Sequence, residues 1–197
     1  MSIRNRALIL AIAGCALPAV AGGGEVGLLY AQQYGKDQMN GSQDYAEVKT
    51  STAGIRAGWT FADLKVVEFS FIGTYQPKAE ADLLLNGTKI GKYGVSYGAL
   101  GAQVGWKFLV NFNVGIEYRQ EKLTSDRGAL GKYETTLNRP WARAGIGFSI
   151  PLPVVSPFFR VEIAAPLTKE DISNSPEAIA KAMAPQGQAG VYVGIRF

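Results

Sequence analysis

The sequence predicts an all-β fold, an eight-stranded antiparallel up-and-down β-barrel that crosses a membrane. From residue 22 onward, apolar residues recur at every second position, which is the period of a strand with one apolar face. The connections between these segments alternate between short and long. The chain is 47 % hydrophobic, yet beyond the N-terminal leader no uncharged apolar run reaches the roughly 20 residues that a spanning helix needs.

Eight segments carry this alternation. In the second segment, for example, apolar residues stand at positions 55, 57, 59 and 61, and the residues between them are arginine, glycine and threonine. The eight segments comprise residues 26–34, 55–61, 67–71, 100–108, 114–119, 142–150, 159–163 and 187–197. The last segment ends on a free phenylalanine, and we expect it to pair with the first segment and close the barrel.

The lengths of the connections predict a meander. Three are short, at residues 62–63, 109–111 and 151–153, and four are long, at residues 36–46, 77–92, 122–136 and 168–186. Within the second long connection, Asn86 and Gly87 stand between apolar residues and predict a tight hairpin turn, so the strands there extend beyond the membrane. Within the last, Ser175-Pro176-Glu177 predicts the start of a short helix that ends before Pro185.

One face of the predicted strands combines glycines with charges of both signs. Its charged members are Arg56, Glu68, Lys107, Glu117, Arg119, Glu121, Arg143, Arg160, Glu162 and Arg196. An eight-stranded barrel has an interior just wide enough to be filled by side chains. We therefore expect these residues to line a closed lumen and to form a salt-bridge network in which each ion needs a partner.

The other face is nearly free of charge and is bounded by aromatic residues at two levels. The girdle near the short turns is Trp59, Phe61, Trp106, Phe108, Phe112, Phe148, Phe159 and Phe197, and the tyrosines toward the long loops are Tyr30, Tyr34, Tyr75 and Tyr118. Aromatic girdles around an apolar band are typical of membrane barrels, and closure satisfies every backbone amide. The alternative, a secreted soluble barrel of lipocalin type, requires a polar outer face.

The N-terminus predicts a secretory signal peptide, residues 1–21, cleaved after Ala21, followed by a single domain of residues 22–197. Arg4 and Arg6 precede an apolar stretch, and the residues before the cut are small, as in such leaders. A lipoprotein box ending at Cys15 is the alternative. Two of the 20 basic residues lie in the leader, so 18 remain against 16 acidic residues, and the net charge falls from +4 to +2. This balance gives no support for binding nucleic acid.

The C-terminal residue Phe197, with apolar residues at every second position before it, resembles the assembly signal of bacterial outer-membrane barrels. The third residue from the end of that signal is often aromatic, whereas here it is Ile195. Residues 22–197 resemble the small eight-stranded barrels of the OmpX, Ail and OmpA membrane-domain type. The resemblance implies a Gram-negative outer membrane, reached through the periplasm, with lipid, lipopolysaccharide and the barrel assembly machinery as partners.

The residue inventory argues against an enzyme. The chain has no histidine, so it cannot form the histidine-dependent sites of outer-membrane lipases and omptin proteases. It has no histidine metal site and no paired cysteines, and no cofactor is expected. Glu117, Glu121 and Glu162 could act as a general acid and base, but cations outnumber anions on their face, which favours salt bridges.

We therefore expect a structural or surface-interaction role, in adhesion or envelope integrity, carried by the extracellular loops. Mixed charges in the long loops suit contact with lipopolysaccharide, with host or cell-surface ligands, or with water alone. The alternative is a narrow porin-like or small-molecule transport barrel. A filled interior leaves little open cross-section for such a path.

Overall fold

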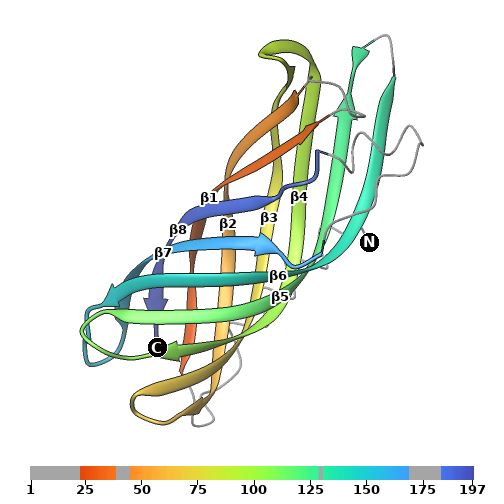
Figure 1. Ribbon diagram of the computed structural model, residues 1–197. Helices are drawn as coiled ribbons and strands as arrows, with labels where there is room; N and C mark the ends of the chain where they lie inside the picture. The colour runs from red at the N-terminus through yellow and green to blue at the C-terminus, as the bar shows by residue number, and fades with distance from the viewer. Residues whose placement is uncertain (1–22, 39–44, 129–130, 169–182) are drawn as a thin grey trace, which may run out of the picture.

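The protein, described here from a computed structural model, forms a closed barrel of eight antiparallel strands (Figure 1). The structure describes residues 23–38, 45–128, 131–168 and 183–197. The strands are β1 (Gly24–Gln38), β2 (Tyr45–Asp63), β3 (Val67–Leu85), β4 (Thr88–Trp106), β5 (Asn111–Asp126), β6 (Lys132–Ser149), β7 (Ser156–Pro166) and β8 (Gly187–Arg196). Each strand pairs with its neighbours in sequence, and β8 pairs with β1 from Glu25↔Arg196 to Tyr34↔Gly187. The predicted up-and-down barrel and its closure are confirmed.

The stagger of the strands follows from the cross-strand register. A path of Cα partners that begins at Thr60 on β2 and passes once around the barrel returns to β2 at Thr50, ten residues away. With about 3.3 Å per residue and about 4.8 Å between strands, this stagger tilts the strands by about 40° and gives a backbone radius of about 8 Å. A ring of this radius is filled by inward side chains.

Several strands are longer than the alternation predicts. Residues 77–92 do not form a loop: β3 and β4 continue through them to a two-residue turn at Asn86 and Gly87, whose φ angles are 50° and 80°. Positive φ at both central residues is what a type I′ hairpin turn requires, which confirms the turn. Of the predicted loop 122–136, only residues 127–131 connect the strands.

The three short connections are displaced by a few residues. β2 continues through Asp63, so its turn is residues 64–66 and not 62–63; the next turn is residues 107–110 and the last is residues 150–155. Most of the predicted final helix, and the predicted cleavage after Ala21, lie outside the described residues. Within the described residues, no helix is long and apolar enough to cross a membrane.

The barrel wall is taller on one side. β2, β3 and β4 each have 19 residues, whereas β7 has 11 and β8 has 10. Because every strand has one of its two ends near the short turns, the β3–β4 hairpin rises well above β7 and β8 (Figure 1). The side chains that could carry function therefore lie in three places: the lumen, the outer face, and this extended wall.

Candidate functional site

The lower part of the lumen is filled by buried charged side chains. Arg56 is 1 % exposed, and Arg119 and Glu121 are fully buried. These long side chains fit because glycines face them from neighbouring strands. A Cβ at Gly101 would lie 2.7 Å from the Cβ of Glu117, and one at Gly58 would lie 2.8 Å from Cγ of Glu25. The sequence therefore places a long charged side chain on one strand and, opposite it on the next strand, a glycine that leaves room for that side chain.

An alternating chain of ion pairs begins at the short-turn rim. Lys107 Nζ lies 2.5 Å from Oδ2 of Asp63 and 3.8 Å from Oε2 of Glu68. Arg196 donates to both carboxylates of the next level, at 2.9 Å to Glu68 Oε1 and 3.0 Å to Glu25 Oε2. Opposite charges alternate at every step, so no free charge of either sign faces the short-turn opening along this part of the chain.

The series of ion pairs continues through the middle of the lumen around Glu162. Oε2 of Glu162 accepts a hydrogen bond from Arg56 Nη1, and Arg56 also donates to the hydroxyl of Thr74 at 2.9 Å. Two more guanidinium groups lie at longer range: Arg143 Nη1 is 3.8 Å from Oε2 and Arg160 Nη1 is 3.7 Å from Oε1. One carboxylate thus holds three arginines, which come from β2, β6 and β7.

Arg119 is held between two aromatic rings above this level. Its guanidinium lies 3.8 Å from the ring centre of Trp141 and 4.3 Å from that of Tyr97, within the range of cation–π contact. It donates to Glu117 Oε1 at 2.5 Å and to Gln188 Oε1 at 2.8 Å. Arg119 therefore connects β4, β5, β6 and β8 across the full width of the lumen.

The top of the charged lumen is tied to the segment that precedes β8. Arg139 donates through Nε to Glu121 Oε2 at 2.7 Å and through Nη2 to the carbonyl oxygen of Pro185 at 2.9 Å. The backbone N–H of Gln186 donates to the carbonyl of Tyr34 at 2.9 Å. These bonds fold Met183 and its neighbours inward over the arginine.

The structure brings the ten sequence-predicted lumen residues into one series of contacts, although Lys107 and Arg196 sit at its partly exposed rim. Besides Asp63, the rim partner of Lys107, which the sequence placed in a short turn, sequence reasoning missed two buried members, Glu25 and Arg139. Both were visible as a continuation of the alternation: Glu25 stands two positions before Gly27, and Arg139 stands four before Arg143. Neither lay within the range counted as charged strand face.

Above Glu121 the interior changes from charged to apolar. A second cluster fills it and consists of Ala46, Val48, Leu83, Tyr93, Val95, Leu123, Leu137, Met183 and Ala184. Leu83 and Leu123 are fully buried. This apolar core occupies the interior of the extended wall and, together with Met183 and Ala184, closes the lumen above its charged part.

The outer face changes in the opposite sense at the same height. Along β5 the outward, exposed residues are Val114, Ile116, Tyr118, Gln120 and Lys122, and the inward, buried residues are Glu117, Arg119, Glu121 and Leu123. The outside thus turns polar between Tyr118 and Gln120, and the inside turns apolar between Glu121 and Leu123. Below this height the wall has the polarity of a membrane barrel, with an apolar outer face. Above it, the wall has the polarity of a water-soluble barrel, with an apolar inner face.

The predicted aromatic residues lie on this outer face, near the short turns. Phe108 is 61 % exposed, Phe148 51 % and Trp59 41 %. The other five are Phe61, Phe112, Phe159 and Phe197, which are exposed, and Trp106, which is half-buried. The backbone N–H of Phe197 donates to the carbonyl of Gly24 at 2.9 Å, and a Cβ at Gly24 would lie 2.8 Å from the Phe197 ring. Gly24 therefore makes room for the last residue of the chain.

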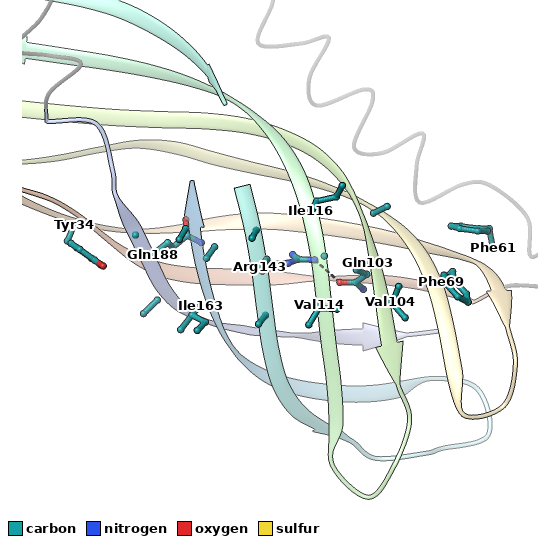
Figure 2. Close-up of a pocket in the computed structure, with 18 residues that line it drawn as sticks. Tyr34, Phe61, Phe69, Gln103, Val104, Val114, Ile116, Arg143, Ile163 and Gln188 are labelled. Carbon is teal, nitrogen blue, oxygen red and sulfur yellow. Dashed lines mark hydrogen bonds between the residues drawn. The ribbon is translucent and has the colours of Figure 1, made fainter. Parts of the chain in front are cut away.

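Figure 2 shows the residues around a pocket on the barrel wall. Most of its lining residues, among them the exposed Val114, Ile116 and Ile163, belong to the apolar outer face. Arg143 and Gln103, drawn in the same view, belong to the inner face and are joined by a hydrogen bond of 2.6 Å. The pocket is therefore an apolar depression outside the barrel and not an entrance to the lumen.

The chemistry available in the lumen is that of paired charges. Glu117, Glu121 and Glu162 each accept a hydrogen bond from an arginine, so none of the three is poised as a free acid or base. Within the described residues no group of histidine, cysteine, aspartate and glutamate could hold a metal ion. The arrangement stabilises a filled barrel.

The fold and lumen define the class: a small eight-stranded barrel with the architecture of outer-membrane proteins. Neither a protein-family model nor the sequence of a curated protein matches the chain. Solved structures similar to it include Ail of Yersinia pestis, with 13 % identity over 89 % of this chain and 99 % of Ail, at a TM-score of 0.49. Neisserial surface protein A has 11 % identity over 91 % and 98 % of the two chains, at 0.47. The outer-membrane protease OmpT of Escherichia coli has 8 % identity over 93 % and 99 %, also at 0.47.

Proposed function

We propose that this chain is an integral outer-membrane protein of a Gram-negative bacterium whose extended wall serves surface interaction. The observation that carries the proposal is the joint inversion of polarity on the inner and outer faces. An apolar outer band with aromatic residues at two levels matches the lipid-facing surface of membrane barrels. Above this band, polar outward residues and an apolar core suit a rigid extension into water.

The upper part of β6 offers a feature that a partner could recognise. Among the described residues, positions 132–139 of β6 pair only with β5, because β7 pairs with β6 from Trp141 onward. The last contact is the N–H of Leu167 donating to the carbonyl of Pro140 at 2.8 Å. Backbone groups alternate between the two sides of a strand, so those of Thr136 and Asn138 point to the unpaired side. An added strand of a partner would pair there.

Proline substitutions test this mode of interaction. Thr136→Pro removes an N–H that points to the unpaired edge, where proline is tolerated. We expect a folded barrel whose cells adhere less to host cells and matrix. Thr136→Ala is the control for the side chain and should leave adhesion unchanged. Unchanged adhesion of cells that display folded Thr136→Pro protein would contradict the edge as the binding surface.

The alternative of a narrow porin-like or transport barrel requires an open path. In the described part of the chain, the lumen is filled by ion pairs below and by an apolar core above. We therefore expect no channel steps from the folded protein in planar lipid bilayers. Reproducible steps from preparations that contain only folded barrel would favour transport. A role as an enzyme is not proposed, because the chain lacks histidine and its central carboxylates are paired.

A further inference from the structure

One guanidinium in the lumen, that of Arg143, has no carboxylate of its own. Within the described residues, the luminal network contains seven cations and six anions, the rim pair included. Each anion has a nearer cationic partner than Arg143. The pairs are Lys107–Asp63, Arg196–Glu68, Arg160–Glu25, Arg56–Glu162, Arg119–Glu117 and Arg139–Glu121. A single positive charge is left over.

The contacts of Arg143 agree with this count. The residue is 3 % exposed, and its Nη1 lies 3.8 Å from Glu162 and 3.9 Å from Glu117. Those carboxylates are hydrogen-bonded to Arg56 and Arg119 instead. The hydrogen bond that Arg143 donates in Figure 2 goes from Nη2 to Oε1 of the neutral Gln103. Among the described atoms, Nε and Nη1 have no hydrogen-bond partner. Arg143 thus shares two carboxylates at salt-bridge distance with nearer arginines and has no carboxylate hydrogen-bonded to it. Burial of a charge that lacks its own hydrogen-bonded partner is unfavourable.

Two further unpartnered amides lie beside it. The Nε2 group of Gln103 and both polar side-chain atoms of Asn113 have no hydrogen-bond partner among the described atoms, and each residue is 3 % exposed. Gln103 and Arg143 are both register partners of Gly115, and Asn113 is the register partner of Gly145. The three side chains therefore project inward from adjacent positions of β4, β5 and β6. Their unused groups are mainly N–H donors, which bind anions.

We propose that Arg143, Gln103 and Asn113 form a binding site for one small monovalent anion of the halide type. The surplus of one charge requires a monovalent ion, and the packed lumen requires a small one. The carboxylates of Glu117 and Glu162 lie near Nη1 and repel an anion there. The anion therefore binds on the Nε side, where the two amides donate to it. Water would satisfy the amides but would leave the charge of Arg143 uncompensated.

Bromide is the probe that tests this site. The refolded barrel is unfolded with urea at constant ionic strength, with bromide replaced stepwise by gluconate, which is too large for the site. Because a ligand of the native state stabilises it by mass action, the urea midpoint of the wild type rises with the logarithm of bromide concentration. Arg143→Gln abolishes this rise, and Lys122→Gln, which removes an exposed cation outside the luminal network, retains it. Equal wild-type midpoints in bromide and gluconate would overturn the proposal.

A crystallographic measurement keeps the test decisive if Arg143→Gln does not fold. Crystals of the wild-type barrel grown in bromide are measured at the bromine absorption edge. An anomalous peak within hydrogen-bond distance of Arg143 Nε supports the site. Density at that position without an anomalous signal means water and overturns the proposal. Gln103→Leu, which keeps the charge and removes one amide donor, should weaken the bromide dependence several-fold.

Discussion

The carbonyl oxygen of Pro185 accepts a hydrogen bond of 2.9 Å from the guanidinium of Arg139. This bond joins the last arginine of the lumen to the segment that enters β8. Since β7 and β8 are the two shortest strands, the segment closes the barrel on the side where the wall is low. The same guanidinium holds Glu121, so one residue links the ion-pair network to the closure of the lumen.

Replacing Arg139 should therefore lower the free energy of unfolding by more than the loss of its hydrogen bond to Pro185 alone would. Arg139→Gln leaves the carboxylate of Glu121 buried without its cation, which costs about 3–5 kcal/mol. The double variant Arg139→Gln/Glu121→Gln removes both charges and should recover a large part of this loss. Urea unfolding followed by tryptophan fluorescence measures all three free energies. Strictly additive losses would mean that the two residues do not act as a pair.

Glu162 should be the least replaceable carboxylate of the lumen. It faces three guanidinium groups, those of Arg56, Arg143 and Arg160, and is 3 % exposed. Glu162→Gln should lower the free energy of unfolding by about 3–5 kcal/mol or prevent folding.

The matched control for Glu162 is Glu68→Gln, because Glu68 pairs at the partly exposed rim with Arg196 and Lys107. Water can solvate those cations, so this variant should cost less than Glu162→Gln. The folding yield in detergent and the urea midpoint of unfolding are measured for both variants, Glu68→Gln and Glu162→Gln. A rim variant as damaging as the central one would contradict the assignment of Glu162 as the centre of the network.

The apolar core of the extended wall should open separately from the membrane barrel. Leu123→Ala removes a fully buried side chain and should cost about 2–5 kcal/mol through the cavity it leaves. The loss should be local, so cleavage by an added protease increases in the wall while the barrel below stays intact. Leu109→Ala, at a turn residue that is 99 % exposed, is the control. Equal protease resistance of the Leu123 and Leu109 variants would contradict a packed core in the wall.

An ion pair outside the membrane should titrate with a depressed pKa. Lys122 Nζ donates to the carboxylate of Glu134 at 2.6 Å across β5 and β6, and this hydrogen bond lowers the pKa of Glu134 below its ordinary value of 4.5. A carboxyl group with a depressed pKa stabilises the fold above its unfolded pKa, and the contribution is lost as pH falls through the folded pKa. The stabilising contribution of this ion pair is therefore lost at pH values below about 4.5. NMR titration should show the Glu134 midpoint rise in Lys122→Gln; an unchanged midpoint would contradict the pairing.

The sequence was most informative where one face of a strand stays apolar. The alternation located all eight strands because lipid requires an apolar outer face over the whole membrane band. It failed above that band, since the apolar residues move to the inner face. Leu123 then stands out of phase with Ile116, so β5 seemed to end and a loop was predicted. Only the Asn86-Gly87 turn carried a local signal for the extended wall.

The pairing of charges was beyond the reach of the sequence for a different reason. Which arginine meets which glutamate depends on a stagger of ten residues around the barrel, and no local pattern encodes that stagger. Arg56 and Glu162, for example, are 106 residues apart in sequence and hydrogen-bonded across the lumen. Residue types on the inner face were therefore predictable, and their partners were not.

Cysteine labelling along β5 tests the placement of the wall most directly. In a Cys15→Ser background, Ile116→Cys, on the apolar outer band, and Lys122→Cys, above it, are exposed to a membrane-impermeant maleimide on intact cells. We expect Lys122→Cys to react rapidly and Ile116→Cys to react only after the membrane is dissolved and the protein is unfolded. Equal, rapid labelling of both positions in intact cells would mean that water covers the apolar face and that the barrel does not cross the membrane.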